Sequence, residues 1–298
     1  MKKLFIIITI LLLSGCSKAN ELGENDIITA FYADYSEETL FEVSAEILDF
    51  KETSNTKAHI ETAYGKSIQS AYANLINNMK NPPYQGHTGV LILGDGICLN
   101  GLREAIEFFS DMNSISPNIN VMLTEDSFSD FEPLSIFEAT KAKAIPAIPV
   151  YTLFMPSDSL SVIPVIRANE GSPEKSGGII SDNLNFKCYI NENLYTSYAL
   201  ITNKFEDSFF KSFEVLNTRC KTKNKNETLK INLNLTLKNL SKTENEKIKA
   251  DILKDISEFL EEIKKNSSYD VLKKGNFKKA EVEINITVPD TGKLKERS

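Results

Sequence analysis

The feature that most constrains the fold is a strict alternation of apolar and polar side chains in two segments near the carboxyl end of the chain. Residues 229–237 carry Leu or Ile at every second position, with Lys, Asn or Thr between them, and residues 280–288 repeat the pattern. A period of two predicts strands with one buried face. Between these segments, apolar side chains recur at helical spacing: Ile248, Ile252, Ile256, Phe259, Leu260 and Ile263. This part is therefore predicted to be a twisted, mainly antiparallel sheet with one long helix across it.

The first half of the chain alternates between strand-like and helix-like patterns. Continuous apolar runs or a period of two mark strands, and apolar side chains three or four residues apart mark helices. The predicted strands lie at 28–32, 41–46, 90–93 and 121–123, and the predicted helices at 68–79 and 102–109, with a polar loop at 51–61 and a turn at 94–96. This order predicts helices packed on a small mixed sheet.

A proline-rich stretch at 145–173 divides the chain, and two glycines follow it at 177–178. We place the domain boundary here. It separates an N-terminal α/β region of one or two subdomains, 26–174, from a C-terminal domain, 175–298. The predicted fold class is α+β, in several domains. Further strands are expected between 178 and 200, with polar turns at 181–183 and 191–193.

The amino-terminal residues have the pattern of an export signal. Two lysines precede an apolar run at 4–13, and Leu13-Ser14-Gly15-Cys16 ends it. A run of about ten apolar residues is too short to cross roughly 30 Å of hydrocarbon as a helix, so it predicts a cleaved signal peptide at 1–15. The Leu-Ser-Gly-Cys ending resembles the lipobox of bacterial lipoproteins, in which the cysteine is diacylated and becomes the new N-terminus. An ordinary secretory signal with a chance cysteine is the alternative.

The mature chain is thus predicted to begin at Cys16 and to continue as a polar tether through residue 25. Two or three acyl chains hold a protein at a membrane stably, whereas a single chain does not. No later segment has an apolar run long enough to cross a bilayer. The lipid is therefore the predicted membrane attachment.

Composition narrows the classes of partner. Hydrophobic residues make up 41% of the chain and charged residues 25%, as in folded soluble proteins. The formal net charge is −7, and about −9 once the lysines of the signal are removed, which argues against binding nucleic acid or an anionic membrane surface. Cys98, Cys188 and Cys220 lack the spacing of a zinc site. They are predicted to be buried small apolar side chains, and a disulfide between one pair is the alternative outside the cytosol.

The two histidines give no sign of a catalytic or metal site. His59 lies in the predicted polar loop, and His87 precedes the buried strand at 90–93. They lack the HExxH spacing that places two ligands on one helix face, and the chain has no G-x-S-x-G nucleophile elbow. We expect His59 to be a surface residue and His87 to make a structural hydrogen bond. No metal and no cofactor are predicted.

Gly94-Asp95-Gly96 and the later Gly101 lie between a strand and a helix, where a phosphate loop would lie. Their spacing is not G-x-G-x-x-G, and no Lys-Ser/Thr follows, so a tight turn is predicted instead. Asp34, with the acids at 37 and 38, is predicted to be solvated surface charge. The sequence therefore predicts a protein that binds a partner or acts as a scaffold. No catalytic residues are predicted.

An ordered series of short motifs accompanies the lipobox. It consists of Glu21-Leu22, Gly65-Lys66-Ser67-Ile68, Gly86-His87, Gly94-Asp95, Gly101-Leu102, Phe108-Phe109, Ser110-Asp111, Gly177-Gly178 and Ser268-Tyr269-Asp270-Val271. In this order the chain resembles the C-subunit lipoproteins of spore germinant receptors, the GerAC-like family. It departs from the family pattern in three ways. Ser110 stands where the family has Arg, Ser17-Lys18 replaces an aromatic-acidic pair, and no Trp follows Asp270.

The resemblance implies a non-enzymatic receptor subunit that folds as mixed α and β domains. It implies a place on the outer surface of the spore's inner membrane, beside two integral membrane partner subunits of the A and B types, and a need for the protein in nutrient-triggered germination. The residue carried over with a defined role is Cys16, as the diacylglycerol acceptor.

Two other classes remain as alternatives. A solute-binding lipoprotein of a transporter would need two α/β lobes around a ligand cleft, which the alternating second half does not favour. A surface enzyme would need a nucleophile or metal constellation that the sequence lacks.

Overall fold

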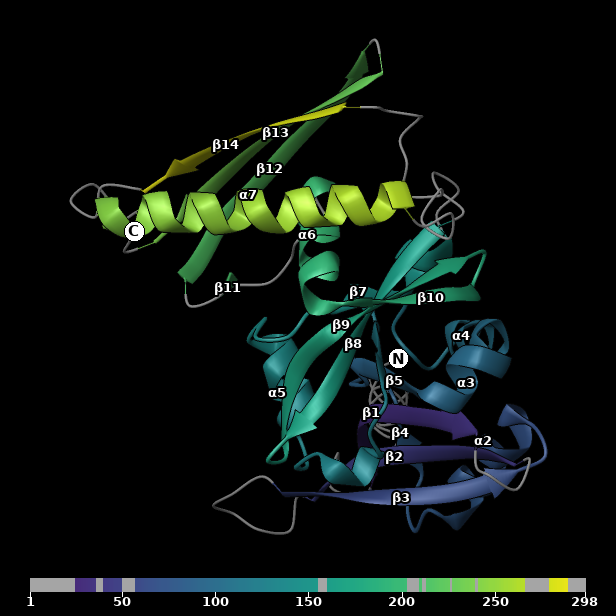
Figure 1. Cartoon of the computed structure of the whole chain (residues 1–298). Helices are drawn as coiled ribbons and strands as arrows, with labels where there is room; N and C mark the ends of the chain where they lie inside the picture. The colour runs from purple at the N-terminus through teal and green to yellow at the C-terminus, as the bar shows by residue number, and fades with distance from the viewer. Residues whose placement is uncertain are drawn as a thin grey trace, which may run out of the picture.

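The computed structural model describes residues 25–35, 40–49, 57–154, 160–202, 209–210, 213–225, 227–238, 241–265 and 279–288. These residues form a large sheet with helices on both faces and a smaller sheet covered by one long helix (Figure 1). The predicted α+β class is confirmed. The first sheet has ten strands, so it is larger than the small sheet that the sequence predicts.

The large sheet has four parallel strands at its centre and antiparallel pairs on each side. In spatial order its main strands are β10 (Asn185–Asn191), β9 (Ser172–Asp182), β8 (Leu160–Asn169), β6 (Asn120–Thr124), β5 (Val90–Gly94), β1 (Asp26–Tyr35), β2 (Phe41–Asp49) and β3 (Lys57–Gly65). Two short strands complete it, β4 (Pro83–Tyr84) beside β1 and β7 (Ile148–Pro149) beside β6. Strands β1, β5, β6 and β8 run parallel, so their carboxyl ends meet at one edge.

The helices of the first half cover the two faces of this sheet. α2 (Ile68–Asn78), α3 (Asp95–Asn100) and α4 (Leu102–Ser110) pack on one face, whereas η2 (Phe128–Asp130) and α5 (Ser135–Lys141) pack on the other. β5 is buried along its whole length. Its Leu91 and Leu93 join the first core, and Val90 and Ile92 join the second. A continuous apolar run is what a strand buried on both faces requires.

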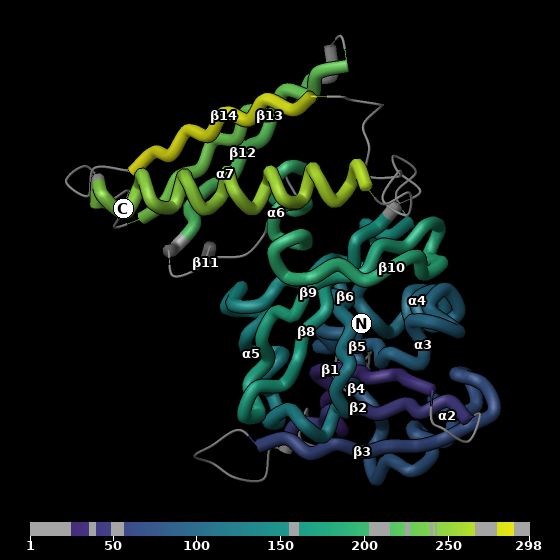
Figure 2. The backbone as a smooth tube through the Cα atoms, in the orientation of Figure 1, coloured from purple at the N-terminus to yellow at the C-terminus, as the bar shows by residue number. Residues whose placement is uncertain are grey.

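The small sheet follows the predicted alternation. Its order is β11 (Phe209–Phe210), β12 (Phe213–Lys225), β13 (Thr228–Leu237) and β14 (Lys279–Thr287), and α7 (Lys242–Lys265) lies across it (Figure 2). Leu or Ile at alternate positions of β13 packs in one core with the apolar stripe of α7. β11, β12 and β13 pair antiparallel, but β14 runs parallel to β13, because α7 carries the chain back across the sheet.

Helix α6 (Glu192–Thr202) joins the two sheets. Its Tyr195, Tyr198 and Leu200 share one core with Ile180 of the large sheet and with β13 and α7 of the small sheet. Asn191 precedes the helix and accepts a hydrogen bond from the Leu194 N–H at 2.9 Å. The sequence analysis predicts a turn and strand here, and that prediction is wrong. Residues 195–200 of α6 are all buried. The helix therefore has no exposed polar face that would alternate with an apolar one at a period of 3.6 residues.

One other expectation is wrong, and the domain boundary can be placed against the strands. The predicted loop at 51–61 ends early, since β3 begins at Lys57 and includes residues 57–61. β3 is the edge strand of the large sheet, and none of its residues 57–61 is buried, so this part of the strand has the polar composition of a loop. The predicted division between 174 and 175 falls inside β9, which pairs with β8 and β10 in the large sheet. The change from one sheet to the other comes after β10, and the domain limits stay a prediction.

A buried carboxylate holds the segment between η2 and α5 in place. Glu46 on β2 is 4% exposed. It accepts hydrogen bonds from the Thr29 hydroxyl and, at 2.6 Å, from the backbone N–H of Leu134. Leu134 has a φ of 67°, a left-handed conformation that is unfavourable for a γ-branched residue. The hydrogen bond to Glu46 compensates for that strain.

Replacing Glu46 with Gln should flatten the pH dependence of stability. Burial raises the pKa of Glu46 above its ordinary value of 4.5, although the hydrogen bonds from Thr29 and Leu134 oppose the rise. Above pH 4.5 the folded state therefore keeps a proton that the unfolded state has lost, so this group makes stability fall as the pH rises through that window. Urea unfolding between about pH 4 and pH 7 measures the effect. E104Q, in which an exposed carboxylate is replaced, is the control and should have the pH dependence of the wild type. The prediction fails if the stability of E46Q depends on pH in the same way as that of the wild type.

Candidate functional site

The carboxyl edge of the parallel strands is built around the side chain of Asp34. This residue lies near the end of β1, where the chain meets the end of β5. One carboxylate oxygen accepts hydrogen bonds from the backbone N–H groups of Tyr35 at 2.7 Å and Ile97 at 3.1 Å. The other accepts one from the Tyr32 hydroxyl at 3.0 Å. Burial, together with Asp34, raises the pKa of Tyr32, so its hydroxyl keeps the proton that it donates.

The glycines of the Gly94-Asp95-Gly96 motif make room for this carboxylate. A Cβ atom on Gly94 would lie 2.1 Å from the Asp34 Cγ, and one on Gly96 would lie 2.9 Å from an Asp34 oxygen. The segment is the start of α3, not the predicted turn. Asp34 accepts a hydrogen bond from a backbone N–H in the first turn of α3 and so occupies the place that a bound anion would take at a helix N-terminus. We call Asp34 together with Gly94 and Gly96 the Asp34 cradle, because the two glycines leave room for this side chain.

Asp34 is the residue that the sequence analysis missed, because it grouped this side chain with solvated surface acids. The signal that could have found it is its position directly after the apolar strand β1, combined with two glycines after the neighbouring strand. Together these features indicate a close approach between a side chain and the backbone.

The next residue, Asp95, connects the cradle to β10. The Tyr189 hydroxyl of β10 donates a hydrogen bond to the Asp95 carboxylate. Cys98 lies on the same helix, α3, and is 1% exposed. Burial raises the pKa of the Cys98 thiol to about 12. The thiolate is the nucleophilic form, so Cys98 is chemically inert at neutral pH.

Cys98 should therefore resist alkylation in the folded protein. At pH 8 we expect its reaction with iodoacetamide to be slower than in the urea-unfolded chain by on the order of 1,000-fold. Mass spectrometry of digested samples measures the labelled fraction at each cysteine. Cys188 is less buried than Cys98 and serves as the internal comparison. Equal labelling of Cys98 and Cys188 in the folded protein would contradict the prediction.

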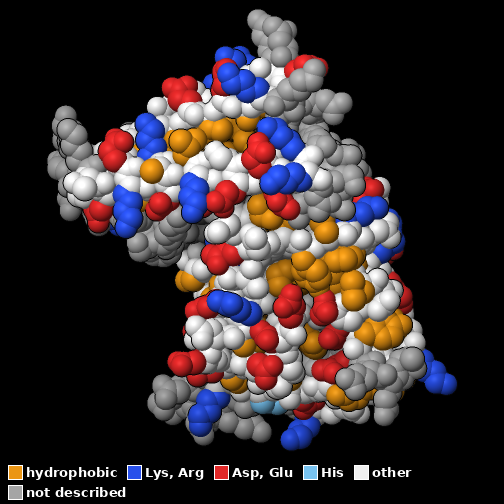
Figure 3. All heavy atoms as spheres, in the orientation of Figure 1, with side chains coloured by type: hydrophobic (Ala, Val, Ile, Leu, Met, Phe, Trp, Pro, Cys, Tyr) orange, Lys and Arg blue, Asp and Glu red, His pale blue; other side chains and the backbone are white. Residues whose placement is uncertain are grey.

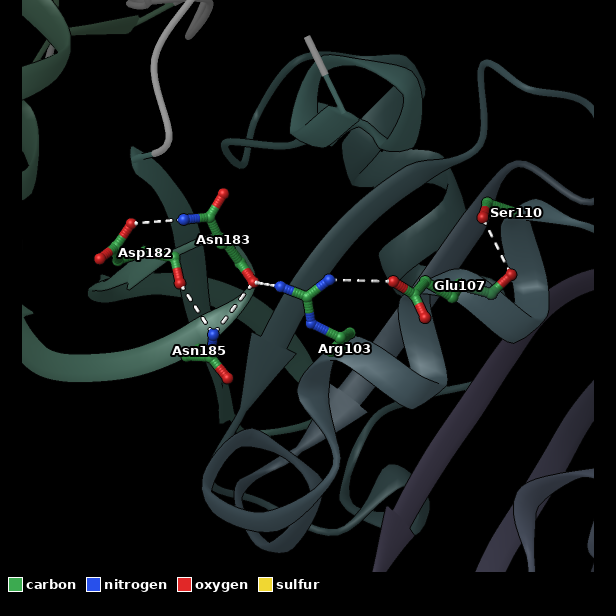
Figure 4. A network of polar contacts seen from close by, with 6 residues as sticks. All are labelled: Arg103, Glu107, Ser110, Asp182, Asn183 and Asn185. Carbon is green, nitrogen blue, oxygen red and sulfur yellow. Dashed lines mark hydrogen bonds and ion pairs between the residues drawn. The ribbon is translucent and has the colours of Figure 1, made fainter. Parts of the chain in front are cut away.

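A second group of polar contacts ties α4 to the turn between β9 and β10 (Figure 4). Arg103 on α4 donates hydrogen bonds to Glu107 of its own helix, at 3.2 Å, and to the backbone carbonyl of Asn183. Asn183 and Leu184 both have positive φ, 49° and 60°, as the two central residues of a type I′ hairpin turn do. Leu184 is buried in the first core, so the hairpin is fixed to α4 by both packing and polar contacts.

The remaining glycine motifs also serve close packing. A Cβ on Gly177 would lie 2.3 Å from the Ile190 carbonyl oxygen, and one on Gly178 would lie 2.5 Å from the Tyr195 ring. Gly65 allows the chain to turn into α2, whose first turn Ser67 caps. These glycines position β10, α6 and α2 and present no functional group.

Hydrophobic side chains gather on the surface around β10 and α3, at the waist between the two sheets (Figure 3). Leu99 on α3 is 55% exposed and Tyr189 on β10 is 37% exposed. The Phe186 ring lies beside that of Tyr189, with 5.2 Å between centroids. We call Leu99, Tyr189 and the partly buried Phe186 the waist patch. Grouped apolar side chains that are exposed, as Leu99 and Tyr189 are, are typical of interaction surfaces.

The other predicted site residues are spread over the molecule. His59 lies on β3 and not in a loop, with its Nε2 3.7 Å from a Glu61 oxygen. His87 is exposed, and the Tyr84 ring lies beside it, with 5.4 Å between centroids. Cys98, Cys188 and Cys220 form no disulfide among themselves. Other predicted features lie outside the described residues: the signal peptide at 1–15, Cys16, the tether to residue 24 with the Glu21-Leu22 pair, the acids at 37 and 38, and the segment at 268–271.

Within the part of the chain that the structure describes, no group of three or more His, Cys, Asp or Glu side chains is placed to hold a metal ion. None of the helices described is long and apolar enough to cross a membrane. The carboxylates of Asp34 and Asp95 are each engaged by donors of the protein itself.

Comparison with known proteins decides the family. A model of the spore germination protein N-terminal domain matches residues 18–167. The chain belongs to the GerAC-like family of spore germination proteins. The matched segment contains the Asp34 cradle and every motif of the family from Gly65 to Asp111. The resemblance that the motif order indicates is thus confirmed, and close packing explains the motif glycines Gly65 and Gly94 within the matched segment.

Two further comparisons accompany this match. The crystal structure of the GerBC protein is similar over 87% of this chain and 97% of that one, with 12% sequence identity and a TM-score of 0.42. No curated protein matches the sequence.

Proposed function

We propose that this GerAC-like protein is the lipoprotein C subunit of a nutrient germinant receptor. In this proposal, lipid on Cys16 holds it at the outer face of the spore's inner membrane, where it supports or relays a signal through integral membrane partner subunits. The observation that carries the proposal is the family match over residues 18–167. The lipobox-like Leu13-Ser14-Gly15-Cys16 directly before that segment supports the anchor.

The structure supports a role in binding rather than in catalysis. The strand-end carboxylate that could act as a base, Asp34, accepts three hydrogen bonds from the protein itself. A carboxylate whose lone pairs are committed in this way fixes backbone geometry. Leu99 and Tyr189 of the waist patch, by contrast, are exposed, and we propose that the partner subunits contact the protein there.

The alternative of a solute-binding lipoprotein gains no support from the fold. Such a protein would hold its ligand between two α/β lobes. Here the second unit is a four-stranded sheet with one covering helix, and α6 occupies the junction with the large sheet.

Deleting the gene tests the proposal. Spores without the protein should fail to germinate with the nutrient that their receptor detects, and an intact copy of the gene should restore the response. The measurement is the fall in optical density of a spore suspension after nutrient addition. Normal germination of the deletion strain, in a background where no other receptor responds to that nutrient, would contradict the proposed function.

A further inference from the structure

The small sheet has one covered face and one open face. α7 and α6 pack on the apolar face, and the polar side chains of the alternating strands line the other. On this open face a hollow of about 660 Å³ runs across β12, β13 and β14. The strand register arranges polar residues of this face in three rows: Lys223, Lys230 and Glu281; Lys221, Asn232 and Glu283; and Arg219, Asn234 and Asn285.

The acids that line the open face lie on β14, whereas its cations lie on β12 and, at Lys230, on β13. The acids of β14 are already satisfied, since Glu281 pairs with Lys230 at 2.8 Å and Glu283 accepts a hydrogen bond from Asn232 at 2.9 Å. The cations of β12 differ. Arg219, Lys221 and Lys223 are exposed, and no described carboxylate forms an ion pair with any of them. This edge therefore carries a row of three cations that form no ion pair with a described carboxylate.

Among the described residues, most of the backbone of β12 has no strand partner at the same edge. β13 pairs with one side of β12 along its length, whereas β11 pairs with the other side only at Phe213 and Glu214. From Val215 to Lys225 no described strand lies beside that side. An edge strand with free N–H and C=O groups is a template for one more strand.

We propose that β12 binds an extended acidic segment of a partner protein as an added strand of the small sheet. Arg219, Lys221 and Lys223 are two residues apart, so their side chains repeat every ~6.6 Å along one face. A strand with Asp or Glu at every second position has the same repeat, and it can place one acid opposite each cation while its backbone pairs with β12.

The charge pattern also makes the site selective. The whole chain carries a formal charge of −7 and repels acidic partners in general. Only a segment that adopts the register of β12 meets the basic row. A phosphodiester polymer has a comparable charge spacing but no amide groups for the free edge, so the backbone favours a peptide. This inference does not depend on the lipid anchor or on a role in germination.

A labelled peptide tests the added strand. The probe is a fluorescein-tagged peptide of about nine residues with alternating Glu and Val, titrated with the full chain purified in detergent and followed by fluorescence anisotropy. We expect saturable binding. Replacing Arg219, Lys221 and Lys223 together with Gln should weaken it about tenfold or more. Replacing Lys247, Lys249 and Lys254 of α7 with Gln removes the same charge elsewhere and should leave the affinity unchanged.

Backbone pairing is tested separately from charge. N-methylation of the peptide amides that would face β12 keeps every carboxylate but prevents strand pairing, and it should abolish binding. Amide hydrogen exchange should slow in residues 215–225 when the unmodified peptide is bound. Equal binding of the methylated peptide, tighter binding of inorganic polyphosphate than of the peptide, or equal loss in both triple variants would each overturn the proposal.

Discussion

Replacing Cys16 with Ala should move the protein from the membrane fraction into the soluble fraction and reduce nutrient germination to the level of the gene deletion, while the fold stays intact. The acyl chains are the proposed attachment, and two or more of them are needed for stable anchoring. Without them the local concentration of the protein beside its partners falls by about a hundredfold or more. Fractionation of spore lysates with immunoblotting and the optical-density assay of germination measure the two effects.

A matched control and a rescue make the result specific. Cys188→Ala removes a thiol of the large sheet and should leave both localisation and germination unchanged. A variant in which a transmembrane helix replaces residues 1–16 should germinate normally although it lacks Cys16, because the helix attaches the protein to the membrane without lipid. A Cys16→Ala protein that stays in the membrane fraction and supports normal germination would show that the lipid is dispensable.

Replacing Gly94 with Ala should lower the free energy of unfolding by about 3 kcal/mol, at the upper end of ordinary overpacking costs. The added methyl would lie 2.1 Å from the Asp34 Cγ, so the carboxylate must leave its place. Ile97 N–H and the Tyr32 hydroxyl then lose their acceptor, and a buried donor without a partner adds to the cost. Urea unfolding followed by circular dichroism measures the change.

Two comparisons identify the cause of that loss. Gly101→Ala should change stability by less than about 1 kcal/mol, because its Cβ would meet the Phe41 ring at 3.7 Å, an ordinary contact distance. Combining Gly94→Ala with Asp34→Ala should cost less than the sum of the two single changes, with a coupling of about 1–2 kcal/mol. Additive losses, or equal losses for the two glycines, would rule out the cradle as the explanation.

The elements with a clear periodic pattern could be predicted from the sequence. The strand at 229–237 and the helix at 68–79 each have one face in a core and one in solvent. Apolar residues therefore recur along each segment with the period of a strand or of a helix. The edge strand β3 and the connecting helix α6 could not be predicted in this way. No residue of the first five in β3 is buried, whereas residues 195–200 of α6 are all buried, so neither stretch shows a clear contrast between two faces.

The site illustrates a second limit of sequence reasoning. Spacing alone shows that Gly94-Asp95-Gly96 is not a phosphate loop, but it cannot show what lies against the two glycines. Asp34 is about sixty positions earlier in the chain and is brought there only by the parallel pairing of β1 with β5. Which side chain packs against a glycine depends on the topology of the sheet. That topology is set by long-range strand pairing, which a local sequence pattern does not contain.

The position of α6 within a core shared by both sheets has a thermodynamic consequence. The small sheet cannot separate from the large one without exposing Tyr195, Tyr198 and Leu200 to water, and burial of each large side chain contributes on the order of 2 kcal/mol. We therefore expect the two sheets to unfold together in one cooperative transition.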